Sequence, residues 1–145
     1  FFFIHGSTKS KKLLSLVDED ANSFNSIMEA YKLPKDSEGN KQIRSKAIKD
    51  ATLYAAQIPL NIMVESYNSY EIIEFLAKEG NQNSLSDSGV ACLCVHTAIH
   101  GAYLNVRINL KDATGGEDIM KKADKILKDS HSKKEKIMKL VEDKL

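Results

Sequence analysis

The sequence predicts an all-α domain, a helical bundle of four to five helices around a buried central helix. Its 145 residues include only seven glycines and two prolines, too few for the many turns of a β-sandwich. Apolar residues recur at helical spacing along most of the chain, and they make up 42% of it, enough to bury a core. A chain of this length suits one domain.

A first helix is predicted over about residues 10–33, where apolar side chains share one face at 100° per residue. Pro34 ends the pattern, because proline cannot continue a helix. Asp36 or Ser37 can then cap the next helix. The apolar face of the first helix consists of Leu13, Val17, Phe24, Ile27, Met28 and Tyr31.

The next two helical segments, about 38–58 and 60–78, are separated by Pro59. Proline removes a backbone donor and crowds the preceding turn, so we expect a kink or a break there. Gly80 is expected to close the third segment in a left-handed conformation. Ser84 or Ser86 can cap the fourth helix.

The fourth helix, about 87–110, is apolar almost all round, which predicts a helix buried on most sides. Small side chains along it would allow a neighbouring helix to approach closely. The last helix, about 117–145, carries many charges and a narrow apolar seam, as expected of an outer helix. The small residues are Ala91, Ala98, Ala102, Asn105 and Asn109, and the seam is Met120, Ala123, Leu127, Ile137 and Val141.

Composition excludes several classes of partner. A net charge of +1 creates no strong field for nucleic acid or for an anionic membrane, and no uninterrupted apolar run is long enough to predict a transmembrane helix.

Cys92 and Cys94 are interpreted as reduced thiols of a cytoplasmic protein. Cys92, His96 and His100 repeat every four residues, but no further ligands at metal spacing accompany them, so no metal site is expected.

One carboxylate of the first helix is anomalous. Measured from Leu13, Asp20 lies at about −20°, inside the apolar stripe, whereas Asp18 lies at about 140°, on the far side. A buried carboxylate needs a partner, and an apolar setting favours the protonated form that suits a general acid or base near neutral pH. Asp20 is therefore a candidate catalytic residue. The alternative is an aspartate that bonds a helix end or pairs with a buried Arg or Lys.

The start of the fourth helix is a candidate binding site. Ser86, Asp87 and Gly89 lie where free backbone N–H groups favour an anion or a carbonyl group. An ordinary capped helix start is the alternative.

The end of the same helix carries two amides, Asn105 and Asn109, one turn apart. They need a partner, either a ligand or a neighbouring helix. Arg107, on another face, can bind a carboxylate or pair with Asp or Glu.

Several blocks of the sequence, in this order, resemble the cyclodeaminase/cyclohydrolase family of folate enzymes. The resemblance covers about residues 13–145 and leaves 1–12 as an unmatched N-terminal segment. The family begins with a helix opened by a Pro-Gly-Gly-Gly-Ser motif, so this chain resembles a member that lacks its N-terminal helix. The blocks are 16–21 (LVDEDA), 24–25 (FN), 31–35 (YKLPK), 55–60 (AAQIPL), 80–81 (GN), 86–91 (SDSGVA) and 101–110 (GAYLNVRINL).

The resemblance implies an all-helical homodimer and a catalytic aspartate. The family includes formimidoyltetrahydrofolate cyclodeaminase, either free-standing or as the C-terminal half of formiminotransferase-cyclodeaminase, and methenyltetrahydrofolate cyclohydrolases. Its catalytic aspartate is the second Asp of a Val-Asp-x-Asp motif, which here is Asp20. No cofactor is implied beyond the tetrahydrofolate substrate. The candidate substrate-binding residues are Ser86, Asp87, Gly89, Asn105, Arg107 and Asn109.

The expected function is therefore that of a folate-dependent cyclodeaminase of one-carbon metabolism and histidine degradation. It would release ammonia from formimidoyltetrahydrofolate and form 5,10-methenyltetrahydrofolate. One alternative is a methenyltetrahydrofolate cyclohydrolase giving 10-formyltetrahydrofolate, and another is a non-catalytic helical dimerisation module. The expected partners are the folate substrate and a second copy of the chain, in the cytoplasm, with neither nucleic acid nor membrane.

Overall fold

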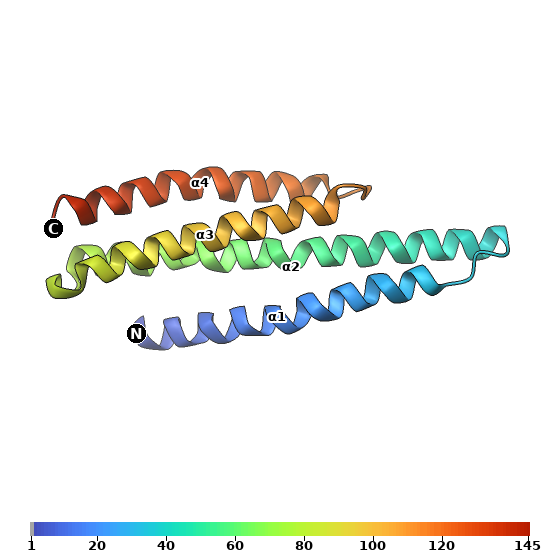
Figure 1. Ribbon diagram of the computed structural model, residues 1–145, viewed down its shortest axis with the longest axis horizontal. Helices are drawn as coiled ribbons and strands as arrows, with labels where there is room; N and C mark the ends of the chain where they lie inside the picture. Colours follow the sequence, from blue (N-terminus) through green and yellow to red (C-terminus); the bar gives the residue numbers. More distant parts are fainter. Residues whose placement is uncertain (1) are drawn as a thin grey trace.

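In the computed structural model, residues 2–145 fold into an elongated bundle of four long helices and one short 3-10 turn (Figure 1). Side chains are described for residue 8 and for residues 10–145. The predicted all-α class is confirmed. The elements are α1 (Phe2–Lys32), α2 (Glu38–Glu79), η1 (Gln82–Ser84), α3 (Leu85–Leu110) and α4 (Glu117–Glu142).

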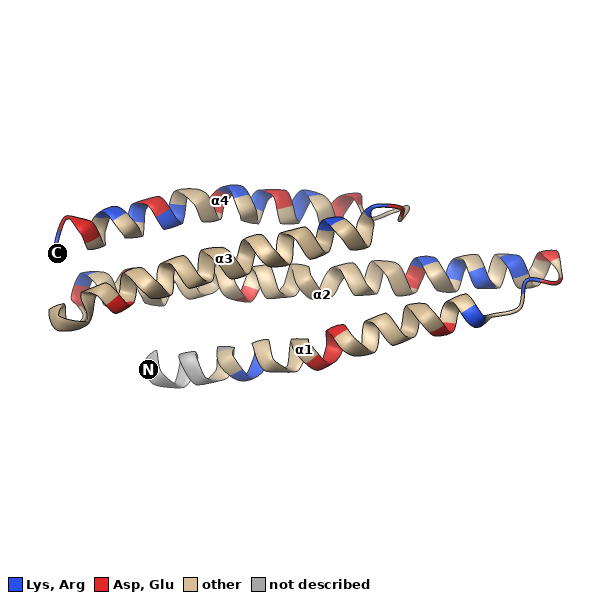
Figure 2. Cartoon of the chain, in the orientation of Figure 1, with Lys and Arg blue, Asp and Glu red and all other residues tan. Residues whose placement is uncertain are grey.

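The helix α2 organises the bundle, because it packs against α1, α3 and α4. α4 also packs along α3, so α1 and α4 lie at opposite edges of the bundle (Figure 1). Charged side chains crowd α4 and the N-terminal half of α2, whereas α3 carries few (Figure 2). This distribution agrees with the predicted charged outer helix at the C-terminus.

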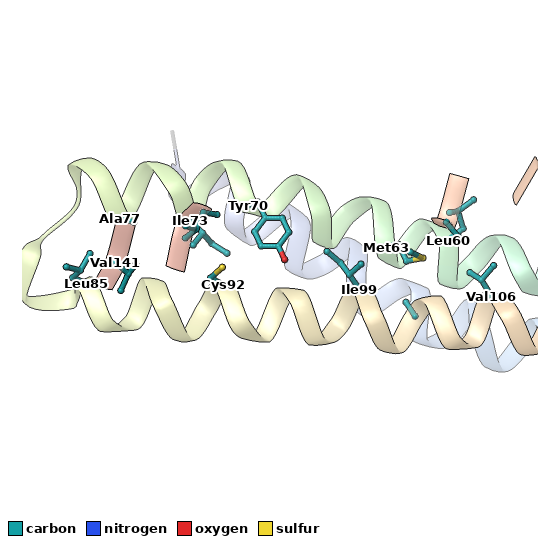
Figure 3. Packing of buried hydrophobic residues seen from close by; sticks show 13 residues of the cluster. Leu60, Met63, Tyr70, Ile73, Ala77, Leu85, Cys92, Ile99, Val106 and Val141 are labelled. Atoms are coloured by element: carbon teal, nitrogen blue, oxygen red, sulfur yellow. The ribbon is translucent and has the colours of Figure 1, made fainter. Parts of the chain in front are cut away.

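Apolar side chains of α2, α3 and α4 form one continuous core (Figure 3). The predicted seam of α4 is confirmed, since Ala123, Ile137 and Val141 are buried in this core. Tyr70 lies in its middle, with the edge of its ring against Tyr67. Other core residues include Leu60, Met63, Ile73, Leu85, Cys92, Ile99 and Val106.

Of the two predicted alternatives at Pro59, a kink or a break, the break is wrong, because α2 continues through this residue. A proline at this position has no N–H to donate to the carbonyl oxygen of Ala55, four residues earlier. Nδ2 of Asn109 on α3 donates to that oxygen instead, at 2.9 Å. Pro59 and Ala55 are both buried in the interface between the two helices. Packing on α3 therefore supplies the hydrogen bond that the local sequence lacks.

The prediction that α3 is buried on most sides is wrong for a single chain. Val90, Leu93, Leu104 and Ile108 are exposed, because α2 and α4 together cover only part of the helix. Within Gln82–Leu110, an 18-residue window reaches a mean hydropathy of 1.2, so this helix is, by length and composition alone, apolar enough to cross a membrane. Core helices of soluble proteins meet the same criterion, and α3 contributes several fully buried side chains to the core.

The predicted helix ends are partly confirmed. Ser37 caps α2, its side chain accepting a hydrogen bond from the backbone N of Asn40 at 3.2 Å. Gly80 has φ −76°, so the predicted left-handed conformation is wrong. A Cβ there would lie 2.4 Å from the carbonyl oxygen of Leu76, which explains the glycine by close approach. Ser84 occupies the N-cap position of α3, but its side chain makes no capping hydrogen bond, and Ser86, the predicted alternative, lies inside the helix.

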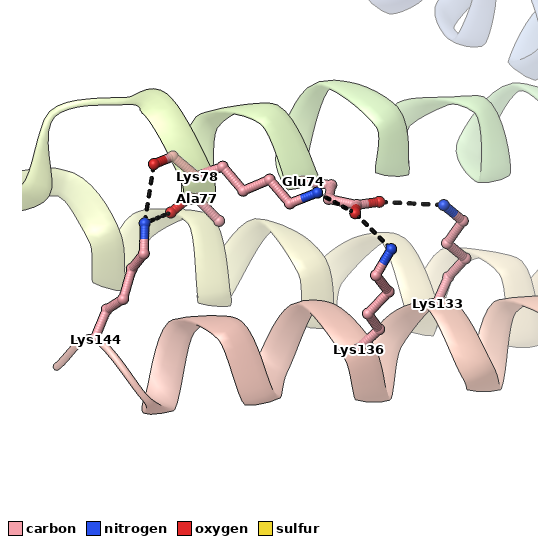
Figure 4. Close-up of polar contacts among 6 residues, drawn as sticks. All are labelled: Glu74, Ala77, Lys78, Lys133, Lys136 and Lys144. Carbon is pink, nitrogen blue, oxygen red and sulfur yellow. Dashed lines mark hydrogen bonds and ion pairs between the residues drawn. The ribbon is translucent and has the colours of Figure 1, made fainter.

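Glu74 of α2 joins three lysines between α2 and α4 (Figure 4). Its Oε1 lies 2.8 Å from Nζ of Lys136 and 2.8 Å from Nζ of Lys78, and its Oε2 lies 3.1 Å from Nζ of Lys133. These ammonium groups, led by that of Lys136, hold the pKa of Glu74 at about 2. Nearby, Nζ of Lys144 donates to two carbonyl oxygens in the last turn of α2. Both groups of contacts fasten α4 to the end of α2.

Candidate functional site

The helix α1 presents a different face to α2 from the one that its apolar pattern predicts. Leu16, Ser23 and Ala30, spaced seven residues apart, are buried. Two of these side chains are small, so they allow the backbones of α1 and α2 to approach closely. The larger apolar residues of the predicted face are turned outward, with Phe24 63% exposed and Tyr31 53% exposed.

The exposed position of Asp20 follows from this orientation. The predicted phase holds, because Asp20 lies on one stripe of α1 together with Val17, Phe24 and Tyr31. The prediction that this stripe is buried within one chain is wrong. Asp20 is therefore a carboxylate flanked by exposed apolar side chains on an exposed face of α1.

Two contacts between α1 and α2 indicate where Asp20 lies along the axis of the bundle. Lys12 near the start of α1 forms an ion pair with Glu65 of α2. At the other end, Nε and Nη2 of Arg44 both donate to the carbonyl oxygen of Tyr31 at 3.2 Å. Because the two helices run antiparallel with equal rise, these contacts place Asp20 level with the Ala55–Ala56 pair of α2.

The end of α3 lies at this same level. Asn109 contacts the carbonyl oxygen of Ala55, as described above, and is half-buried. Ile108 and Asn105 are exposed and lie on neighbouring turns of α3. We refer to Val17, Asp20, Phe24 and Tyr31 of α1, together with Asn105, Ile108 and Asn109 of α3, as the α1–α3 face.

A cavity of about 330 Å³ is lined by residues from both helices of the α1–α3 face. Tyr31 lines it from α1, and Ile108 and Asn109 line it from α3. Because Tyr31 and Asp20 share one stripe of α1, Asp20 faces the same side of the bundle as this cavity. The remaining lining residues are Ser45, Ile48, Lys49 and Thr52 of α2 and Asp112, Ala113 and Thr114 of the α3–α4 connection.

The chemistry of this region combines apolar and polar groups. Phe24, Tyr31 and Ile108 offer apolar surface against which a flat heterocycle can pack. Lys49 and the amide of Asn109 offer polar groups for carbonyl or carboxylate oxygens. Asp20 is a carboxylate able to accept and return a proton.

The predicted residues at the start of α3 lie elsewhere. Ser86 and Asp87 are exposed, and Asp87 lines a separate cavity of about 290 Å³ between the end of α2 and the start of α3. Gly89 is buried, and a Cβ there would lie 3.3 Å from Cγ1 of Val141, so its role within the chain is close packing of α4. Asp87 is twenty residues from Arg107, about 30 Å along the helix. One chain therefore does not bring both ends of α3 into a single site.

Arg107 does not join the α1–α3 face either. Its guanidinium lies 5.9 Å from the centre of the Tyr103 ring. It lines a cavity of about 630 Å³ with Lys121 and Asp124 of α4. Of the predicted binding residues, Asn105 and Asn109 lie on the same face as Asp20.

The contribution of α2 to this region could not be predicted from the sequence. Lys49 and Thr52 line the cavity, yet they lie in a polar, amphipathic stretch that carries no motif. Their proximity to Asn109 depends on how α2 pairs with α3. The exposed aromatic residues Phe24 and Tyr31 were identified as apolar positions, but as core rather than as surface.

Comparison with known proteins shows consistent similarities. Residues 5–129 match a family described as formiminotransferase-cyclodeaminase. The formimidoyltransferase-cyclodeaminase of Sus scrofa is 40% identical over 105 residues, which are 72% of this chain and 19% of that protein. The methenyltetrahydrofolate cyclohydrolase of Methylorubrum extorquens is 30% identical over 138 residues, 93% of this chain and 66% of that protein.

The fold is also similar to a solved structure. The crystal structure of formiminotetrahydrofolate cyclodeaminase from Thermotoga maritima superposes with a TM-score of 0.72 at 27% sequence identity. The match covers 96% of this chain and 65% of that one. This chain spans about a fifth of the length of the formimidoyltransferase-cyclodeaminases that it matches.

Proposed function

Because this chain belongs to the formiminotransferase-cyclodeaminase family, whose members act on folate one-carbon units, we propose that it carries the site of a formimidoyltetrahydrofolate cyclodeaminase. The observation that carries the proposal is the position of Asp20. It lies at the height of Asn109, on the same side of the bundle as a polar cavity. Apolar side chains on both sides of it offer surface for a pterin ring.

The reaction requires a proton to move between two nitrogen atoms. N10 of the folate attacks the amidine carbon carried on N5, and a C–N bond forms. The proton lost from N10 must then reach the amino nitrogen, because ammonia leaves readily only when that nitrogen is protonated. Breakage of the second C–N bond releases ammonia and leaves the 5,10-methenyl bridge. We assign both proton transfers to the carboxylate of Asp20.

The rest of the α1–α3 face would bind the substrate. The aromatic rings of Phe24 and Tyr31 are exposed beside Asp20 and offer packing surface for the pterin. Lys49 at the cavity is a candidate partner for a carboxylate of the glutamate tail. Ser86, Asp87, Gly89 and Arg107 contribute to the same site only if a second copy of the chain supplies them.

A second copy is part of the proposal. Phe24, Leu104 and Ile108 are between 53% and 63% exposed, and large apolar surfaces of this kind mark interaction sites. We propose that the α1–α3 face is covered in a homodimer. Sedimentation should then show a dimer, and Phe24→Glu should shift it to a monomer. A monomeric wild-type protein at micromolar concentration would contradict this part of the proposal.

The catalytic assignment is tested with a matched pair of variants. The protein, in its natural length, is supplied with formimidoyltetrahydrofolate, and the near-ultraviolet absorbance of the methenyl product and the release of ammonia are followed together. Asp20→Asn should lower turnover by several orders of magnitude while leaving the circular dichroism spectrum unchanged. Asp18→Asn changes an exposed carboxylate on the far side of α1 and should not affect turnover. Near-normal turnover by Asp20→Asn would remove Asp20 from the mechanism.

The cyclohydrolase reaction is a second candidate, favoured by one observation. The Methylorubrum extorquens cyclohydrolase aligns over 93% of this chain, whereas four vertebrate formimidoyltransferase-cyclodeaminases that are 37–40% identical align over 71–77% of it. In that reaction water attacks the methenyl carbon and 10-formyltetrahydrofolate results. Loss of methenyl absorbance without any ammonia release from the formimidoyl substrate would favour the cyclohydrolase.

A further inference from the structure

One side of α3 is exposed and uncharged along almost the whole helix (Figure 2). At 100° per residue its members lie within about 40° of Thr97, opposite the side chains that α3 buries in the core. Within Leu85–Leu110 two side chains are charged, and they lie on the two flanks of this side, Asp87 at about +80° and Arg107 at about −80°. The outer face of α3 is defined as Val90, Leu93, Thr97, Gly101, Leu104 and Ile108.

Two residues of the outer face are suited to burial against another helix. Among the described residues, no atom comes within 4 Å of a Cβ built at Gly101, so no contact inside the chain requires this glycine. A glycine within a helix is destabilising relative to alanine, but it lets a second backbone come close. The hydroxyl of Thr97 already donates to the carbonyl oxygen of Leu93 at 3.0 Å, so covering Thr97 leaves no donor unpaired.

The outer face has a spacing that is symmetric about Thr97. Val90 and Leu104 lie seven residues on either side of it, and Leu93 and Gly101 lie four residues on either side. In a two-fold dimer, residue i of one copy meets residue j of the other, and j meets i. An antiparallel copy with its axis at Thr97 therefore brings Val90 level with Leu104, and Leu93 level with the space that Gly101 leaves.

The flanking charges favour the same direction. Asp87 and Arg107 lie ten residues on either side of Thr97. In an antiparallel pair the two Asp87 carboxylates are therefore about 30 Å apart along the helices, and so are the two Arg107 guanidinium groups. A parallel pair would instead bring each charge level with its own copy, where like charges repel.

We propose that a second copy of this chain packs antiparallel on the outer face of α3, with the two-fold axis at Thr97, and that each copy supplies Asp87 to the folate site of the other. The inference rests on the homodimer of the proposed function and adds to it the register and the contributed residue. Such an axis keeps each flank of α3 on its own side of the dimer. The partner's Asp87, about 15 Å from the axis along the helix, then lies between Asn105 at about 12 Å and Asn109 at about 18 Å on the α1–α3 face.

The opposite flank of α3 belongs to α4. His96 and His100 contact His131 of α4, with ring centroids 4.8 and 6.3 Å apart. Gly89 lies on this flank too, where a Cβ would touch Val141. Since the axis does not exchange the flanks, Gly89 and Arg107 stay on the α4 side in both copies. Of the predicted residues near the two ends of α3, the dimer therefore adds Asp87 to the site and leaves Gly89 and Arg107 outside it.

Disulfide cross-linking tests the register in the protein of natural length. With helix axes about 8–10 Å apart and Cα atoms about 2.3 Å from each axis, the two Thr97 Cα atoms lie about 3.5–5.5 Å apart, which overlaps the range of disulfides. In a Cys94→Ser background, which removes the exposed native thiol, Thr97→Cys should form a covalent dimer on mild oxidation. Ala98→Cys is the matched control, because this exposed neighbour is turned about 100° away and should not cross-link.

A mixed pair of variants determines the direction of the partner. Val90→Cys and Leu104→Cys, each alone in the same background, should not cross-link, because each thiol lies about 21 Å along the helix from its copy. Co-expressed, the two variants should cross-link to each other. In a parallel dimer each of them would cross-link alone.

Complementation tests the shared site. Asp87→Asn should lower turnover of formimidoyltetrahydrofolate by at least about tenfold, since it alters a hydrogen-bonding group of the site. A heterodimer of Asp20→Asn and Asp87→Asn chains holds one site in which both aspartates are native. Co-expression of the two variants should therefore restore up to about a quarter of the wild-type turnover.

The outcomes that overturn the proposal are specific. Failure of Thr97→Cys to cross-link, or cross-linking of Val90→Cys alone, would overturn the register. An active wild-type protein whose mixed variants recover no turnover would overturn the contribution of Asp87. The cross-links are read without substrate, so they decide the register even if the protein proves inactive on folates, and the proposed function fails or holds separately.

Discussion

The hydrogen bond from Asn109 to Ala55 allows a quantitative test of how α2 tolerates Pro59. The carbonyl oxygen of Ala55 cannot receive an N–H from Pro59, and Nδ2 of Asn109 occupies it at 2.9 Å. Asn109→Ala would leave this oxygen without a protein donor. Ala55 is 3% exposed, so its carbonyl lies in a largely dry interface.

The expected cost follows from that burial. An unsatisfied buried acceptor costs about 1–3 kcal/mol. Because Asn109 itself is only half-buried, its removal admits some water, and we expect Asn109→Ala to lower the free energy of unfolding by about 1–2 kcal/mol. Asn105→Ala is the control on the same helix, and as an exposed substitution it should cost less than about 0.5 kcal/mol.

A double-mutant cycle isolates the mechanism. Pro59→Ala restores an N–H to residue 59, which can then bond Ala55 within the helix. In that background Asn109→Ala should cost about 1 kcal/mol less than in the wild type. Urea unfolding followed by circular dichroism gives all four free energies. Additive effects of the two substitutions, with no coupling, would refute the account of Pro59.

Two further predictions concern the α2–α4 interface. Glu74→Gln should lower the free energy of unfolding by about 1–2 kcal/mol at neutral pH, a value below the full pKa shift because the lysines are partly exposed. The pKa of Glu74 is lowered from 4.5 to about 2, so this contribution is fully present above pH 4.5 and is lost as the pH falls to 2. Urea unfolding of the wild type and of Glu74→Gln across this pH range measures the loss. The control Glu71→Gln changes an exposed carboxylate and should show no comparable trend. Cys92 is fully buried, and burial raises the pKa of its thiol, whereas Cys94 is exposed. A thiol reagent should label only Cys94 in the native protein and both thiols in urea, and rapid native labelling of Cys92 would contradict the packing of α3 on α4.

Helical periodicity predicted the elements of this protein well, because it depends on neighbours three and four residues apart. The apolar seam of α4 was recognised in this way, and Ser37 was one of two caps predicted from residue type. The prediction of the buried face failed on α1, where two faces of the helix carry residues that could be buried. On α1 the larger Phe24 and Tyr31 define the stronger stripe, yet Leu16, Ser23 and Ala30 pack on α2.

The candidate site shows the same division. Helical phase grouped Asp20 correctly with Phe24 and Tyr31, and the family resemblance selected the same aspartate. The exposure of this stripe in a single chain follows from neither the helical phase nor the resemblance. The pairing of α1 and α3 with α2 placed Asp20 at the height of Asn109, and no local pattern carries that information.

The helical class of this protein and its family could be predicted from the sequence, and Asp20 could be selected as a candidate for catalysis, because these depend on composition, local spacing and motif. Only the tertiary structure decided which helix faces are buried, how the carbonyl oxygen of Ala55 next to Pro59 is satisfied, and that His131 joins His96 and His100. Those outcomes depend on contacts between residues more than thirty positions apart. Such contacts are selected by the close packing of whole helices rather than by the preferences of any one segment.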